Sequence, residues 1–382
     1  MKIISSYRHY LVSSIQLILF IPFYRQGHVG ADWDSYGSYA SSYLIYSEGI
    51  YYPSRPPGFP FFEYMVSSFL GFGARGVLIV IFLFLIGLNF ITHKLFDNNN
   101  ENDFIYFALL LSPILLISSF SIMDYVVGLF FSLSAIYLAE NYRRPEIPFL
   151  IVILLASATR LSNILFFIAG LYILYKKGSD IKKLFFVSLF YLLGLILIYY
   201  PAYELAGGLC FLNLTNTDHL LFQRLGRFFY KQTYLVGLPG LLVLVYILVK
   251  NRKVFEIVDS YYPYISIFIL FEMSFMRLPT EEGHMLPALF MFFLLLSHLN
   301  ISTKIQAYLF ILIFSTNFLY LDLVEVDTPN HVNEVAFSPS IKDGLLVGDY
   351  KERGIKGLKS NYHIDNAINQ VIESWSNGGP NC

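Results

Sequence analysis

The feature that most restricts the fold of this chain is a series of apolar segments separated by polar stretches. Apolar residues make up 56% of the 382 residues and charged residues only 14%, whereas a soluble domain carries about 25% charged residues. A helix needs roughly 20 apolar residues to cross a bilayer core about 30 Å thick. By this rule, the sequence predicts an all-α polytopic membrane protein with about eleven transmembrane helices.

The candidate spans are 10–24, 74–93, 104–120, 122–140, 147–159, 161–176, 183–201, 234–250, 261–277, 285–299 and 304–321. The first segment resembles the apolar region of a signal peptide. The residues that follow it, Arg25 to His28, lack the small-x-small pattern of a cleavage site, so we interpret this segment as a retained anchor.

The loops between the spans differ in charge, and this difference predicts the topology. Lys and Arg gather in cytoplasmic loops, and short basic patches occur at every second connection of this series. The pattern predicts a multi-pass protein of the cell membrane with a cytoplasmic N-terminus and an extracytoplasmic C-terminus. A large first outer loop, 25–73, and the polar tail then lie outside.

The tail has a different composition from the rest of the chain. Residues 1–321 form the predicted multi-span domain, and 322–382 form a small, polar extracytoplasmic segment. Within it, the pattern predicts a short strand over 344–349 and a helix near 365–375. The two cysteines, Cys210 and Cys382, form no metal or redox motif and could pair only if the fold brings them together.

The first outer loop contains two carboxylates, Asp32 and Asp34, just after the first span. A carboxylate at a membrane surface can act as a general base toward a hydroxyl group. It can also bind a divalent cation together with other oxygen ligands, or it can simply be part of a solvated acidic loop. The spacing alone does not choose among these interpretations.

The same loop contains a rigid turn, Arg55-Pro56-Pro57-Gly58-Phe59-Pro60. Prolines restrict its backbone, and the guanidinium of Arg55 has a shape that suits a phosphate or a carboxylate. The alternative is an interfacial arginine bonded to nearby carbonyl groups.

A basic set, Arg224, Arg227 and Lys231, follows later in the chain. This spacing places the three side chains on one face of a helix. They could bind the phosphate of a donor or an acceptor, or they could belong to an amphipathic helix that lies on anionic headgroups.

The first outer loop resembles that of GT-C glycosyltransferases, the family of the protein O-mannosyltransferases and of the aminoarabinose transferase of lipid A. The resemblance lies in Asp34-Ser35-Tyr36 with Tyr39-Ala40, in Gly49 and Tyr51, and in the Arg55–Pro60 turn. It implies a GT-C-like membrane fold and implies that Asp34 is the catalytic base or a metal contact, with Asp32 as the alternate.

Three later places agree with this resemblance. Asp124 follows the outer turn between the third and fourth spans, and Thr159-Arg160 stands between the fifth and sixth. Arg277 with Glu282 and His284 resembles a region before a late span, although His284 stands where an aromatic residue is common. On this hypothesis Arg55, Arg160 or the basic set binds the donor phosphate, and Arg277 is a further candidate. Asp124, Glu282 and His284 are candidate metal ligands, although Asp124 could instead face the dipole at the start of a helix and His284 could have a structural role.

The resemblance implies a function as well as a fold. It implies transfer of a hexose-type sugar from a dolichyl or undecaprenyl phosphate to a hydroxyl group on a glycan, lipid or protein at the outer membrane surface. Relatives differ in their need for a divalent cation, so a Mg²⁺ or Mn²⁺ cofactor stays open.

Other functions stay open as well. A transporter or lipid flippase without transferase activity is the main alternative, and a membrane protein of assembly with a degenerate site is a third. Nucleic acid is not an expected partner, because the sequence has no basic domain or stripe.

Overall fold

The computed structural model describes residues 2–96, 103–209, 221–251, 261–277, 282–326, 335–357 and 360–376. The chain divides into two compact units, each taken here by itself. Unit 1 comprises residues 1–18, 92–117 and 217–351, and unit 2 comprises residues 19–91, 118–216 and 352–382. Each unit thus combines residues from before and after position 321. Cys210 and Cys382 lie outside the described residues, so their pairing stays open.

The described chain is predominantly helical. Four helices contribute residues to both units: α1 (Lys2–Gln26), α4 (Gly73–Phe96), α6 (Pro113–Ser119) and α16 (Leu345–Gly357). Unit 1 also contains α5 (Asp103–Leu110), α11 (Leu221–Lys250), α13 (Tyr262–Arg277), η4 (Glu282–Met285), α14 (Leu286–Leu296), α15 (Thr303–Ser315), β1 (Leu319–Val326) and β2 (Val335–Asp343). Unit 2 also contains α2 (Trp33–Glu48), α3 (Pro60–Phe69), η1 (Leu70–Phe72), α7 (Tyr125–Asn141), α8 (Glu146–Thr159), η2 (Leu161–Asn163), α9 (Ile164–Lys176), α10 (Ile181–Leu205) and α17 (Ser360–Ser376).

Three segments of the described chain are long and apolar enough to cross a membrane: Pro60–Phe96, Ile181–Leu205 and Arg224–Lys250. Five further apolar helices are shorter, with 10–17 residues each. On α10, Ile196 and Leu197 are exposed, as expected for side chains that face lipid rather than water. The predicted membrane and helical character is therefore supported, whereas the number of eleven spans stays a prediction.

Two details differ from the sequence-based prediction. The predicted span 104–120 is interrupted, because α5 ends at Leu110 and α6 begins at Pro113. Proline disfavours a helical conformation in the residue before it, which explains the break. The predicted strand over 344–349 is wrong, since α16 begins at Leu345. The predicted helix near 365–375 is confirmed as part of α17.

The only sheet in the described residues is a two-stranded antiparallel one that the sequence did not reveal. Strand β1 pairs with β2 so that Tyr320 lies opposite Lys342, with an irregularity between Asp322 and Val324. Lys342 Nζ contacts Asp322 Oδ2 at 2.8 Å. The first residues of β1 are apolar and follow α15 closely. The predicted last span, 304–321, therefore includes them.

The first outer loop is more ordered than its composition suggests, because it contains two helices. Asp32 caps α2, and its Oδ1 accepts a hydrogen bond from the Ser35 N–H at 2.8 Å. Gly49 ends α2 with a φ of 72°, a left-handed conformation that favours glycine. Pro60 then occupies the first turn of α3, where its missing N–H is tolerated.

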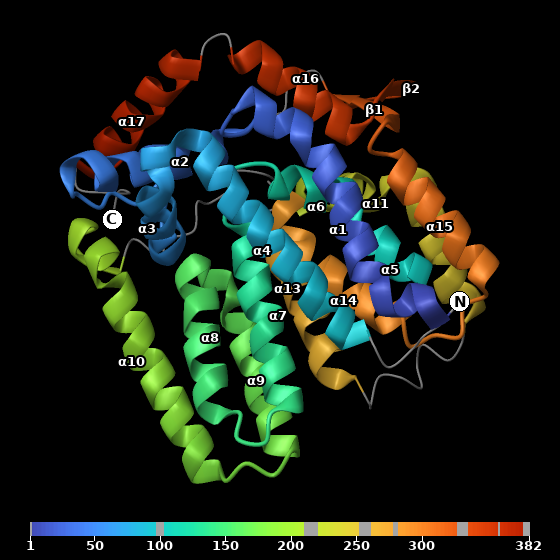
Figure 1. The fold of residues 1–382 in the computed structure, drawn as a ribbon, viewed down its shortest axis with the longest axis horizontal. Coiled ribbons are helices and arrows are strands. Elements are labelled where there is room, and N and C mark those ends of the chain that lie inside the picture. Colours follow the sequence, from blue (N-terminus) through green and yellow to red (C-terminus); the bar gives the residue numbers. More distant parts are fainter. Residues whose placement is uncertain are drawn as a thin grey trace. The chain divides into compact units, whose positions relative to one another are not determined.

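In unit 2, α7, α8, α9 and α10 form a helical bundle in which α8 packs against the other three (Figure 1). Its core contains an aromatic stack, with the Phe167 and Tyr191 ring centroids 3.8 Å apart. The Tyr191 hydroxyl also lies 2.6 Å from Ser157 Oγ. This bundle fixes the end of α8 and the start of α7, which both contribute to the candidate site.

In unit 1, α11 bends at Gly237, where φ is 72°. A Cβ atom at this position would lie 2.1 Å from the Cγ2 of Thr316, so both the backbone conformation and the close approach of α15 require glycine. Pro239 follows two residues later and lies inside the helix. The bend is thus caused by specific residues.

Candidate functional site

The first predicted site residue, Asp34, lies in the first turn of α2 and forms an ion pair with Arg55. The pair joins Asp34 Oδ1 to a terminal nitrogen of Arg55. The Asp34 side chain is 14% exposed and that of Arg55 is 28% exposed. The two residues that the sequence singled out in the predicted first outer loop therefore meet, and both side chains keep a small exposed surface.

A second ion pair joins Asp124, which precedes α7, to Arg160, which follows α8. Arg160 Nη1 donates to Asp124 Oδ2 at 2.8 Å. The side chains are only 3% and 9% exposed for Asp124 and Arg160, respectively. The guanidinium also lies over the Tyr125 ring, 4.2 Å from its centroid, a favourable cation–π geometry.

Phe59 connects the two pairs. The guanidinium carbon of Arg55 lies 5.1 Å from the centroid of its ring, and that of Arg160 lies 5.7 Å away. We call Asp34, Arg55, Phe59, Asp124 and Arg160 the two-pair cluster. Four residues predicted from three separate segments of the sequence thus gather around one aromatic ring, which the sequence had marked only as part of the proline turn.

Glu63 of α3 is a further residue of this region that sequence reasoning missed. Its side chain is fully buried. Its carboxylate accepts hydrogen bonds from the Tyr51 hydroxyl at 2.9 Å, the Ser54 N–H at 2.8 Å and the Phe59 N–H at 3.2 Å. Glu63 thereby fixes the backbone on both sides of Arg55. A lone carboxylate within an apolar segment is costly, and this signal in the sequence could have identified it.

Asp32 has a different environment from Asp34. Besides capping α2, it lies close enough to Tyr36 for its charge to act on the phenol. Burial, together with this charge, raises the pKa of Tyr36 to about 12. The protonated Tyr36 hydroxyl lies 3.2 Å from His28 Nε2. These contacts organise the start of α2, whereas Asp34 is the carboxylate that pairs with Arg55.

The remaining predicted residues lie in unit 1. Lys231 of α11 forms an ion pair with Glu282 of η4 and lies 5.4 Å from the centroid of the Tyr234 ring. Arg224 and Arg227 are partly buried on the same helix, His284 is partly buried in η4, and Arg277 is exposed at the end of α13. The structure therefore pairs one member of the basic set with one of the candidate metal ligands.

No group of three or more His, Cys, Asp or Glu side chains that could hold a metal ion occurs among the described residues. Of the candidate ligands, Asp124 meets Arg160 and Glu282 meets Lys231. A cationic side chain thus already supplies the positive charge at each of these carboxylates.

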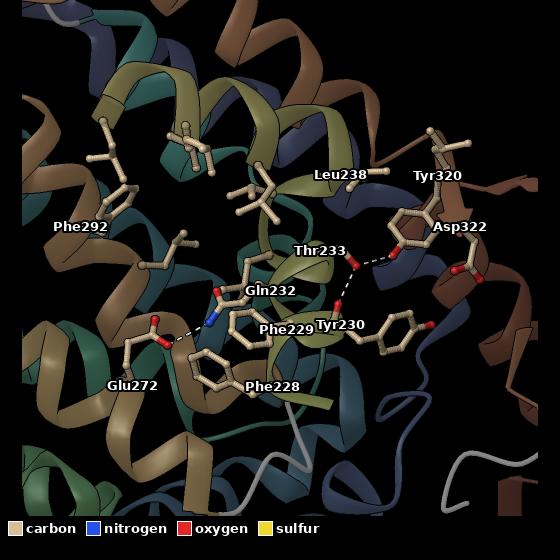
Figure 2. Close-up of a pocket in the computed structure, with 18 of the residues that line it drawn as sticks. Phe228, Phe229, Tyr230, Gln232, Thr233, Leu238, Glu272, Phe292, Tyr320 and Asp322 are labelled. Atoms are coloured by element: carbon tan, nitrogen blue, oxygen red, sulfur yellow. Dashed lines mark hydrogen bonds between the residues drawn. The ribbon is translucent and has the colours of Figure 1, made fainter. Parts of the chain in front are cut away.

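Unit 1 also contains a cavity of about 830 Å³ beside α11, α13 and α14. Figure 2 shows apolar side chains along its wall and polar groups at two places. At one, Gln232 Nε2 donates to Glu272 at 2.9 Å, and at the other, Thr233 Oγ1 lies 2.9 Å from the Tyr320 hydroxyl (Figure 2). A cavity of this size and lining suits an apolar chain with a small polar end.

No protein-family model matches the chain, and neither a curated protein nor a solved structure is similar to it at a significant level. The resemblance to GT-C glycosyltransferases accordingly stays a proposal that depends on the residues described above.

Proposed function

We propose that the protein is a membrane glycosyltransferase that moves a hexose-type sugar from a polyprenyl phosphate to a hydroxyl group of a glycan, lipid or protein. The observation that carries this proposal is the two-pair cluster. It combines a partly exposed pair of a carboxylate and a guanidinium with a second, buried pair beside the same aromatic ring. A base and a phosphate-binding group are the two functions that such a transfer needs.

The Asp34–Arg55 pair provides a way for the donor to prepare the site. The phosphate of the donor competes with Asp34 for the guanidinium of Arg55, and both anions suit its planar shape. When Arg55 turns to the phosphate, the carboxylate of Asp34 is released to accept a proton. Donor binding and activation of the base are then one event.

The chemical step follows from these two roles. Asp34 accepts the proton of the acceptor hydroxyl, whose oxygen forms a bond to the anomeric carbon of the sugar. The bond from that carbon to the phosphate oxygen breaks, and the polyprenyl phosphate leaves with the electron pair. A phosphate leaving group needs little help from an acid, so a single carboxylate on the attacking side is sufficient and predicts inversion at the anomeric carbon.

Arg160 has a supporting role in this proposal. Because its guanidinium is buried and bonded to Asp124, it stays with its partner while Arg55 exchanges partners. Its guanidinium lies near the Phe59 ring, as that of Arg55 does, and thereby limits the positions that Arg55 can take.

The topology that the loop charges predict places the cluster at the outer surface. In this arrangement, about eleven spans cross the membrane, the N-terminus is cytoplasmic and the C-terminus is extracytoplasmic. The substrate is itself a membrane lipid, so it reaches the cluster from the bilayer. The three segments long and apolar enough to span a bilayer support the membrane assignment on which this placement depends.

In unit 1, the basic set and the cavity have features that a lipid phosphate requires. The cavity is lined by apolar groups, and Arg224, Arg227 and Lys231 lie on the helix that forms one of its walls. A photoreactive polyprenyl phosphate tests this role, since it should label α11, and the labelling should decrease in Leu244→Trp, which fills the cavity.

A transfer assay tests the proposed function. The purified protein is mixed in detergent with labelled polyprenyl-phosphate hexoses and candidate acceptors, with and without a chelator, because metal dependence is part of the question. We expect transfer by the wild type and by Asp32→Asn but none by Asp34→Asn. Transfer by Asp34→Asn at the wild-type rate would contradict the proposal, and solute uptake into vesicles that depends on a gradient would favour a transporter.

A further inference from the structure

The C-terminal segment of unit 2, of which residues 352–357 and 360–376 are described, contacts the first loop, which carries Asp34 and Arg55, and the turn that precedes Asp124. Helix α17 packs along α2 (Figure 1). Its buried residues Ala367, Val371 and Trp375 are spaced four apart, so they form one face of the helix. The polar composition of the tail gave no sign of this packing.

Arg353 of α16 is almost fully buried, with 1% of its surface exposed. It donates hydrogen bonds to the carbonyl oxygen of Phe120 and, at 2.6 Å, to Ser121 Oγ. Its guanidinium also lies 4.8 Å from the centroid of the Phe23 ring. The turn that it holds leads directly to Asp124.

Lys356 and Trp375 make corresponding contacts with the first outer loop. Lys356 Nζ donates to the carbonyl oxygen of Ala31, three residues before Asp34. Trp375 Nε1 donates to the carbonyl oxygen of Pro53 at 2.7 Å, two residues before Arg55. In addition, the Ile122 N–H donates to the Val29 carbonyl at 2.7 Å and joins the loop to the turn.

These contacts share a chemical feature. Three side chains of one segment donate hydrogen bonds to backbone carbonyl groups. Each carbonyl lies two to four residues before a residue of the cluster, namely Asp34, Arg55 or Asp124. None of the three donors is paired with a carboxylate of the cluster in these contacts. Bonds to a backbone fix where a segment lies without changing the chemistry of its side chains.

We infer that the C-terminal segment positions the reactive groups, with Arg353 and Trp375 as positioning residues for Asp124 and Arg55. The segment holds the loop and the turn at a fixed separation, so that both ion pairs stay in contact with Phe59. The activity part of this inference rests on the proposed function, whereas its structural part does not.

The test compares variants that remove single donors. Arg353→Met keeps most of the side-chain length and removes the hydrogen bonds, Arg353→Lys keeps a charged donor, and Trp375→Phe removes the indole N–H. Lys351→Met is the matched control, because Lys351 lies on the same helix but is exposed and pairs with Asp343 on the surface.

Amide hydrogen exchange of the detergent-solubilised protein measures how firmly each backbone segment is held, and it does not require activity. We expect Arg353→Met to speed exchange in residues 118–124 and Trp375→Phe to speed it in residues 51–59, with α14 unchanged in both. Arg353→Lys should lie between the wild type and Arg353→Met. Equal exchange in Arg353→Met and Lys351→Met would overturn the inference, as would a general increase across the chain in both Arg353→Met and Trp375→Phe.

The transfer assay supplies the second readout. A misplaced reactive group can cost on the order of 100-fold in rate, so we expect kcat to fall roughly 10- to 100-fold in Arg353→Met, while KM for the donor changes little. An unchanged kcat despite faster local exchange would refute the positioning role. If the wild type itself transfers no sugar, the proposed function fails, and hydrogen exchange still decides whether the segment holds the cluster.

Discussion

The two ion pairs around Phe59 use the same residue types in different surroundings. The side chains of Asp34 and Arg55 are 14% and 28% exposed, but those of Asp124 and Arg160 are almost fully buried. A partly exposed pair contributes little to stability, so its partners can separate when a ligand offers another charge. A buried pair cannot separate without leaving an uncompensated charge. The comparison therefore predicts that the first pair serves chemistry and the second serves the fold.

The largest expected effect is on the rate of sugar transfer when the partly exposed Asp34–Arg55 pair is changed. Asp34→Asn should lower the rate of sugar transfer by about 10²- to 10⁴-fold, because the amide cannot accept the proton. Its stability should change by less than about 1 kcal/mol. Transfer assays and thermal denaturation of the same preparation measure the two quantities.

Asp32→Asn is the control for this variant. Asn caps a helix about as well as Asp, so this variant keeps the hydrogen bond from the Ser35 N–H and loses only the charge. Loss of activity in Asp32→Asn with full activity in Asp34→Asn would reverse the assignment of the base.

The buried pair should show the opposite behaviour. Arg160→Met leaves Asp124 buried without its partner and should destabilise the protein by about 3–5 kcal/mol. The double variant Asp124→Asn/Arg160→Met carries neither charge and should recover much of this loss. Chemical denaturation in detergent checks both. Lys183→Met is the control, because Lys183 pairs with Glu146 and its own side chain is 66% exposed. This variant should lower the free energy of unfolding by less than about 1 kcal/mol. An equally small loss in Arg160→Met would contradict the comparison.

The sequence predicted most of the apolar helices, because the length of an apolar run is a local property, but it missed α2 and α3, which lie in the loop 25–73. It also identified all four charged residues of the cluster, since each belongs to a motif that is contiguous in the chain. The pairing of Asp34 with Arg55 and of Asp124 with Arg160 depends on how helices pack, which no local pattern encodes. The contacts of Arg353 and Trp375 have the same origin, because each joins positions more than 200 residues apart.

Glu63 tests the partly exposed pair from a neighbouring position, because its hydrogen bonds hold the backbone on both sides of Arg55. In Glu63→Gln, one oxygen is replaced by an amide nitrogen that cannot accept a hydrogen bond, so at least one of its three donors loses its partner. An unsatisfied buried donor costs about 1–3 kcal/mol. We expect a loss of this size and a higher KM for the donor, because Arg55 becomes less well placed. Denaturation and steady-state kinetics measure both, and an unchanged KM would remove Glu63 from the site.

The smallest expected effect is the dependence of stability on pH through His28. Burial is the main cause that lowers the pKa of His28, and the positive charges of Arg353, His363 and Lys356 lower it further, against a hydrogen bond to the Gly30 carbonyl that raises it. The unfolded chain therefore binds a proton at His28 before the folded chain does. Stability should be full above the ordinary pKa of about 6.5 and should decrease as the pH falls below it.

Melting temperatures between pH 7.5 and pH 5.5 measure this effect, with His28→Gln as the matched variant. The decrease should be smaller in the variant than in the wild type. Identical pH profiles would mean that His28 keeps its ordinary pKa in the folded protein.

The hydrogen bond between Trp375 and Pro53 has a consequence for the biosynthesis of the chain. The two residues are 322 positions apart, so at about 5–20 residues per second the ribosome needs roughly 16 to 64 s to make the chain between them. During this time, the Arg55 turn is already synthesised but lacks its indole donor. Quality-control proteases and chaperones can meet the turn in this interval, and a ribosome that stalls before α17 releases a chain with all its apolar helices but without this contact.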